Sequence, residues 1–231
     1  MLFRSVVTVL TVSSRFNDPD LWFHLKLGQV VWNTHSIPST DIFSFTTHGH
    51  SWTAHEWLAE LAIYAAYRLG GYSGLMLWFA GLAWLLFALV YFHCYQRCGS
   101  WLVAFLGGVC AWLFATVGLA IRPHLLGYVF LVTELILLEL ASRNRRWLWC
   151  VPPLFAVWVN CHGSYFFGMG VLLVYWLCSF VEGQWGLFVA EARYKGDRRA
   201  LGIVLVLSVV ALCANPIGVR LLLYQIGRAH V

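Results

Sequence analysis

Charge is the scarcest property of this chain. Only 11% of its 231 residues are Asp, Glu, Lys or Arg, and 61% are hydrophobic. Soluble domains are closer to one quarter charged and one half apolar, so an ordinary soluble globular protein is excluded. The 15 Lys and Arg exceed the 10 Asp and Glu. In a membrane protein that excess is an orientation signal, and we expect no nucleic-acid partner.

Several site signatures are also missing. The sequence has no Gly-rich phosphate loop, which argues against a soluble nucleotide ligand. Cys94 and Cys98 are spaced as CxxxC, but no second pair completes a zinc site, and we expect the cysteines to pack as small apolar residues. The nine His residues have no repeated ligand spacing and no Trp-rich haem signature accompanies them, which argues against haem handling.

Aromatic residues and long apolar runs are abundant instead. Aromatic residues make up 17% of the chain and include 13 Trp, a residue that favours membrane-water interfaces. A bilayer core needs about 20 apolar residues per helix. Suitable runs lie at about 74–96, 101–120, 124–142, 147–160, 165–182 and 200–215. With residues 1–12 as the end of a further span, the sequence predicts an all-α polytopic membrane protein of about seven transmembrane helices.

Residues 13–71 differ from the rest. This segment mixes charged residues and histidines with Trp22, Trp32, Trp52 and Trp57. We expect a long outer first loop with surface helices at 21–32 and 57–68 and turns at 33–52.

Basic residues predict the topology, because cytoplasmic loops carry the excess of Lys and Arg. Arg97, the 143–146 loop and the 193–199 loop alternate with the other connections. One topology places all three inside. The loops at 13–71, 121–124, 160–164 and 215–220 then share the outer face, and they hold nearly every chemically interesting residue.

The chain ends have unusual features. Residues 225–231, QIGRAHV, break the apolar pattern, and IGRAHV matches one reading frame of a common sequencing adapter. We therefore expect 226–231 to be an artefact and 1–225 to form one membrane domain that is incomplete at both ends.

The first loop contains the strongest catalytic candidates. Asp20 and His24 are four residues apart and share a helical face, so they can take a proton from a hydroxyl or, with Asp18, hold a divalent metal ion. Asp18 also suits an N-cap before Pro19.

Other outer residues suit a polar or anionic ligand. Arg122 and His124 flank a proline, and the Arg fork matches phosphate oxygens, although Arg122 equally suits a helix anchor in the headgroups. His55, Glu56 and His162 complete the candidate substrate-binding set, with structural roles as the alternative. Glu134 stands near the centre of its span and is left outside the site.

These motifs resemble a known family. The order of DPDLWFH at 18–24, PSTDIFS at 38–44, WTAHEWL at 52–58, RPH at 122–124 and NP at 215–216 is similar to bacterial membrane proteins of the C-type glycosyltransferase superfamily. These are relatives of protein O-mannosyltransferases and aminoarabinose transferases. The resemblance implies that 1–225 is a glycosyltransferase-like domain in the bacterial inner membrane.

The resemblance also implies an activity. It is sugar transfer from a polyprenyl-phosphate donor to an acceptor on the outer, periplasmic face, with an acidic first-loop residue as base. Better-known members carry Asp-Glu there, whereas this chain has Asp18-Pro19-Asp20, so both aspartates remain candidates. A transporter of a small polar or lipid-linked substrate is the alternative, although Glu134 is nearly alone at midplane depth. An inactive scaffold of the same fold is a further alternative.

Overall fold

A computed structural model describes residues 19–115, 121–185, 188–190, 194 and 196–221, and these residues form an all-α protein. The prediction of the all-α class is confirmed. Residues 1–12, Asp18 and 226–231 lie outside the described part of the chain. The elements, in chain order, are α2 (Asp20–Thr34), α3 (Trp57–Cys98), α4 (Trp101–Ala115), α5 (His124–Ala141), the 3-10 helix η1 (Arg145–Cys150), α6 (Val151–Trp158), α7 (Tyr165–Cys178), the short strands β1 (Gly183–Trp185) and β2 (Phe188–Ala190), and α8 (Arg198–Ala211).

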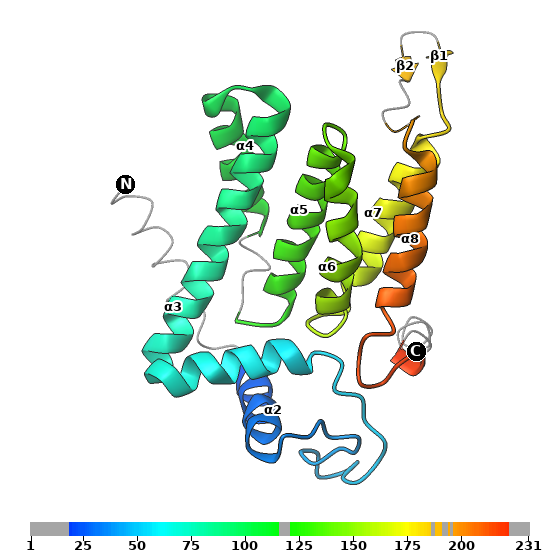
Figure 1. Cartoon of the computed structure of the whole chain (residues 1–231). Helices are drawn as coiled ribbons and strands as arrows, with labels where there is room; N and C mark the ends of the chain where they lie inside the picture. The colour runs from blue at the N-terminus through cyan, green and yellow to red at the C-terminus, as the bar shows by residue number, and fades with distance from the viewer. Residues whose placement is uncertain (1–18, 116–120, 186–187, 191–193, 195, 222–231) are drawn as a thin grey trace.

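Helix α3 is bent into two arms. Gly70 and Gly71 leave the helical conformation, and Gly71 has φ 57° and ψ −140°, a backbone geometry that side chains with a Cβ rarely adopt. The first arm, 57–69, lies across one end of the bundle, and the second arm, 72–98, runs along it (Figure 1). The predicted surface helix and the predicted first full span are therefore one bent helix.

Two described helices, α3 and α5, are long and apolar enough to cross a membrane. Helix α7 and residues Trp101–Leu113 of α4 are shorter apolar helices. Large apolar side chains are exposed along the bundle, among them Leu77, Phe166 and Val206. Exposed apolar surface of this kind supports membrane association.

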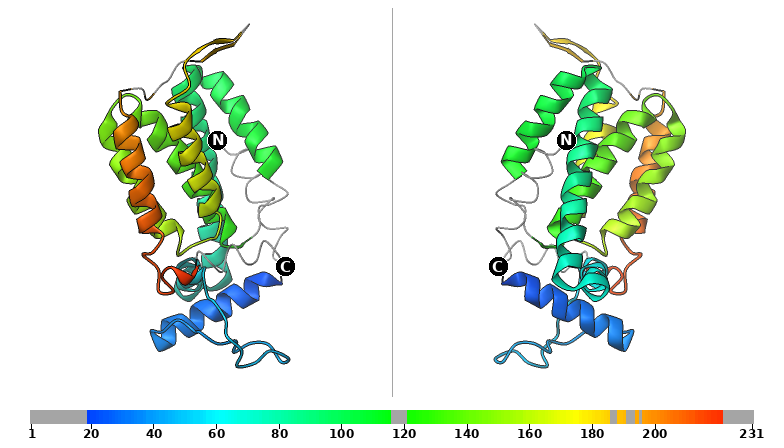
Figure 2. Two further views of the ribbon diagram at one scale, coloured as in Figure 1. Left: turned by 90° about the vertical axis from the view of Figure 1, so that its right-hand side faces the viewer. Right: turned by 90° about the vertical axis from the view of Figure 1, so that its left-hand side faces the viewer.

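Apolar clusters hold the described part of the bundle together. One contains Phe155 and Trp158 with residues from α5, α7 and α8, and another contains Phe79 with residues from α2, α3 and α5. Helix α2 and the first arm of α3 close one end of this bundle (Figure 2).

The predicted turn region, 33–52, is irregular from residue 35 onward, whereas residues 33 and 34 are the last turn of α2. Asp41 organises it: Oδ1 accepts hydrogen bonds from the backbone N–H groups of Phe43 and Ser44, both at 2.9 Å, and Oδ2 accepts one from the Thr47 hydroxyl at 2.8 Å. Hydrogen bonds from Ser44, Phe43 and Thr47 hold the pKa of Asp41 well below its ordinary value of 3.8.

The predicted basic loops meet at the other end of the bundle. Arg97 Nη1 lies 3.1 Å from Glu139 Oε2, and Arg143 donates a hydrogen bond to the carbonyl oxygen of Gln96. Arg145 Nη1 lies 3.6 Å from Asp197 Oδ1, just before α8. We call this the basic end. The prediction that these three loops share one end is confirmed for the described residues, whereas Arg193 and Lys195 lie outside them.

Candidate functional site

The opposite end of the bundle, which we call the polar end, is where α2, the first arm of α3, the start of α5 and the α6–α7 turn meet. An ion pair joins two of these segments there. Arg122 Nη1, which precedes α5, lies 2.8 Å from Asp20 Oδ2 at the start of α2, and both side chains are about half exposed. Exposed ion pairs contribute little to stability. The short contact holds a carboxylate and a guanidinium next to each other. Because both side chains are about half exposed, a ligand can reach them.

A second pair is much more buried. His24 Nδ1 lies 2.9 Å from Glu60 Oε1, and the Glu60 side chain is only 3% exposed. The other carboxylate oxygen, Oε2, is buried and has no hydrogen-bond partner among the described residues. Glu60 is buried because α2 crosses the first arm of α3 closely, with Gly28 directly over the Glu60 backbone.

Glu56 lies between two histidines. Its Oε1 is 3.7 Å from His55 Nε2 and 3.4 Å from His162 Nε2 in the α6–α7 turn. The backbone N–H of Ser164 donates a hydrogen bond to His162 Nδ1 at 3.1 Å. The hydrogen-bond network thus assigns the proton of the neutral ring to Nε2, which faces Glu56.

The charge state of His162 follows from its surroundings. Burial lowers its pKa to about 4, and the neighbouring His124, His55 and His24 act in the same direction. His162 is therefore neutral at pH 7 and faces Glu56 as a neutral ring rather than as a cation. His124 belongs to the same group, because its ring centroid lies 6.3 Å from that of His162 and 5.5 Å from that of Tyr128.

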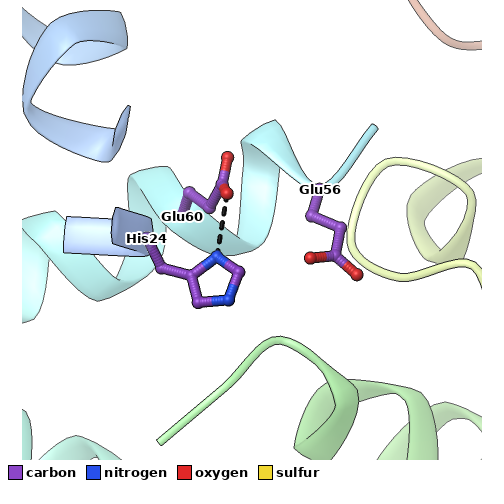
Figure 3. A group of neighbouring side chains, drawn as sticks. All are labelled: His24, Glu56 and Glu60. Atoms are coloured by element: carbon purple, nitrogen blue, oxygen red, sulfur yellow. Dashed lines mark hydrogen bonds and ion pairs between the residues drawn. The ribbon is translucent and has the colours of Figure 1, made fainter. Parts of the chain in front are cut away.

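Three of these side chains form a compact ligand set. His24, Glu56 and Glu60 each offer one ligand atom, and the three atoms lie within 4.8 Å of one another. Figure 3 shows the His24 and Glu60 side chains in contact and the Glu56 carboxylate beside them.

The sequence-predicted site residues that the structure describes all gather at the polar end. They are Asp20, His24, His55, Glu56, Arg122, His124 and His162. Asp18 lies outside the described residues, so its assignment as base, cap or metal ligand stays a prediction. Asp20 and His24 share a face, as expected, and each pairs with a different charged residue.

Sequence reasoning missed two residues. Glu60 was not included in the predicted site, although it lies four residues after Glu56, a spacing that places both on one face of a helix. Asn160 was assigned to the outer face without a role. Its side chain accepts a hydrogen bond from Trp57 Nε1 and donates to the carbonyl oxygens of Ala156 and Ala214. Asn160 thereby holds together the α6–α7 turn, the start of α3 and the segment after α8.

Comparison with protein-family models, curated proteins and solved structures gives no match to this chain.

Proposed function

We propose that this chain forms the membrane domain of a glycosyltransferase that moves a sugar from a polyprenyl-phosphate donor to a hydroxyl acceptor. In this proposal the protein is multi-pass, with about seven spans, in the bacterial inner membrane. The polar end faces the periplasm and the basic end faces the cytoplasm, as the positive-inside rule requires. The observation that carries the proposal is the ion pair between Asp20 and Arg122.

The pair supplies the two groups that such a transfer needs. A guanidinium presents a planar set of donors that matches phosphate oxygens and stabilises the departing lipid phosphate. The carboxylate accepts the acceptor's hydroxyl proton as the new bond to the sugar forms and the sugar-phosphate bond breaks. A donor phosphate that binds Arg122 takes over its guanidinium donors, and this releases Asp20 to act as base.

An apolar cavity farther along α5 suits the lipid tail. Its volume is about 320 Å³, and its lining includes Tyr128, one turn along α5 from His124. The cavity is lined by apolar and aromatic residues of α3, α4 and α5, including Phe87, Val90, Trp112, Leu131 and Val132. A lipid with its phosphate at Arg122 can therefore place isoprene units against α5, at the depth where a hydrocarbon chain belongs.

The test uses the full chain reconstituted in vesicles with polyprenyl-phosphate donors that carry radiolabelled hexose or pentose. We expect acceptor-dependent release of the label from the lipid, measured by extraction and chromatography. An absence of both donor binding and label release, across hexose and pentose donors, would contradict the proposal.

Transport is a second candidate, favoured by one observation. Glu134 of α5 is fully buried, and neither carboxylate oxygen has a hydrogen-bond partner among the described residues. Ionisable groups within a span often mark proton or substrate pathways. Replacing Glu134 with Gln abolishes proton-coupled uptake into vesicles if the protein is a transporter, and it leaves sugar transfer intact if the first proposal is correct.

A further inference from the structure

The buried end of the site has features of a metal centre, separate from the pair formed by Asp20 and Arg122. We propose that His24, Glu56 and Glu60 bind a divalent metal ion of the Zn²⁺ type. Metal binding by these side chains does not depend on the proposed sugar transfer.

The three side chains lie close enough together to share one ion. The three ligand atoms lie within 4.8 Å of one another, and His24 Nδ1 is already 2.9 Å from Glu60 Oε1. Ligand atoms at about 2.0–2.2 Å from a tetrahedral zinc ion are separated by roughly 3.4 Å. Small side-chain rotations therefore convert the observed arrangement into a coordination shell.

One carboxylate oxygen of Glu60 is buried without a partner among the described residues. Glu60 is 2% exposed, and its Oε2 has no hydrogen-bond partner among the described residues. A buried carboxylate oxygen that has lost its water is costly unless another group replaces that water. A cation bound by the Glu60 carboxylate supplies this replacement. It also neutralises two carboxylates that otherwise lie close together.

The neighbours of Glu56 are typical of an outer coordination shell. His162 Nε2 lies 3.4 Å from Glu56 Oε1, and the backbone of Ser164 fixes the other ring nitrogen. Outer-shell groups in such positions orient ligating carboxylates, and loss of one commonly weakens metal binding about 10- to 100-fold. His162 is thus a positioning residue in this proposal.

The donor set favours an ion of the zinc type over Mg²⁺ and Ca²⁺. One imidazole and two carboxylates suit Zn²⁺, whereas Mg²⁺ and Ca²⁺ prefer oxygen ligands alone. Three protein ligands leave one tetrahedral position open, as in catalytic zinc sites.

The experiment uses Co²⁺ as a spectroscopic substitute for Zn²⁺. The purified full chain is treated with a chelator and then titrated with Co²⁺ alone. We expect visible absorption bands of four-coordinate Co²⁺ that saturate at one ion per chain and disappear when Zn²⁺ is added. Metal analysis after dialysis against Zn²⁺ should find one retained zinc ion per chain.

Variants assign the ion to these residues. Glu60→Gln and Glu56→Gln should each weaken Co²⁺ binding by more than about 10-fold, and His162→Ala by about 10-fold or more. Glu139→Gln is the matched control, because Glu139 is also a buried carboxylate but lies at the basic end beside Arg97. It should bind Co²⁺ like the wild type.

Circular dichroism shows whether each variant is folded. Glu56 is less buried than Glu60, so Glu56→Gln keeps the test valid if Glu60→Gln fails to fold. Wild-type Co²⁺ affinity in a folded Glu56→Gln variant would overturn the proposal, as would the absence of saturable one-to-one binding by the wild type. In the latter case, His24 and Glu60 form only a hydrogen-bonded pair.

Discussion

At the scale of single residues, the roles of Asp20 and Arg122 depend on the contact between them. Each has an ordinary role on its own: a first-turn acid favours a helix start, and an Arg at a helix end anchors it at the headgroups. Their 2.8 Å contact makes them one unit. A variant of either residue therefore changes the environment of the other.

Asp20→Asn tests the proposed base. Asn keeps the size and an acceptor oxygen but loses basicity, and a general base typically contributes about 100- to 10,000-fold in rate. We expect sugar transfer to fall by that factor while the protein stays folded and still binds the donor, as measured by transfer assays alongside donor-binding assays. Asp18→Asn should be milder, because Asn caps a helix nearly as well as Asp. The opposite ranking would assign the base to Asp18.

Arg122 tests the proposed phosphate contact. We expect Arg122→Ala to weaken donor binding more than Arg122→Lys, because Lys keeps the charge and loses only the two-pronged geometry. The measurement is the dissociation constant for a polyprenyl-phosphate sugar in detergent or nanodiscs. Equal affinity of the wild type and Arg122→Ala would show that Arg122 is a structural anchor.

At the scale of elements, the crossing of α2 over the first arm of α3 builds the buried half of the site. A Cβ added to Gly28 would lie 2.1 Å from the Glu60 carbonyl oxygen and 2.8 Å from Tyr64 Cβ. Only glycine lets the two helices approach this closely. The close approach is what buries Glu60 and brings His24 to it.

Gly28→Ala should force these two helices apart. Because the clash is with backbone, we expect a loss of stability of about 1–3 kcal/mol, together with weaker Co²⁺ binding at His24 and Glu60. Thermal unfolding and Co²⁺ titration provide the two measurements. Gly81→Ala is the control: Gly81 also lies in a helix, and a Cβ there meets nothing within 4 Å. Equal effects of the two substitutions would contradict the close-crossing argument.

At the scale of the whole molecule, the described residues separate into a polar end and a basic end. Arg97, Arg143 and Arg145 lie at one, whereas Asp20, Glu56 and His162 lie at the other. This separation matches the alternation of loops along the sequence. Because the two ends are separate, labelling one residue at each end tests the proposed orientation in the membrane.

Single cysteines introduced into a cysteine-free background test the orientation. We expect Ser39→Cys and Ser51→Cys to react with a membrane-impermeant maleimide in intact cells, because both positions are exposed in the loop at the polar end. Arg145→Cys should react only after permeabilisation. Labelling of position 145 in intact cells would reverse the orientation and remove the proposed periplasmic site.

Much of the helical arrangement was predictable because its signals are local. The predicted helix at 21–32 is α2, Asp20–Thr34, and the predicted span at 124–142 is α5, His124–Ala141. The mixture of polar and aromatic residues in one segment, and the uninterrupted apolar run in the other, can each be recognised without knowing the rest of the fold. The bend of α3 at Gly70 and Gly71 falls between the predicted surface helix at 57–68 and the predicted span at 74–96, but the sequence did not show that the two segments form one bent helix.

The sequence by itself determined the all-α class, the abundance of apolar helices and which residues share an end of the bundle, because composition and loop alternation constrain each of these. Only the tertiary structure decided which polar groups meet. Glu60 looked like one more polar residue of a surface helix, yet it is 2% exposed because α2 packs over it at Gly28. Contacts such as His24 to Glu60 and His162 to Glu56 depend on how separate helices cross. That crossing is set by close packing between distant segments, which no local pattern encodes.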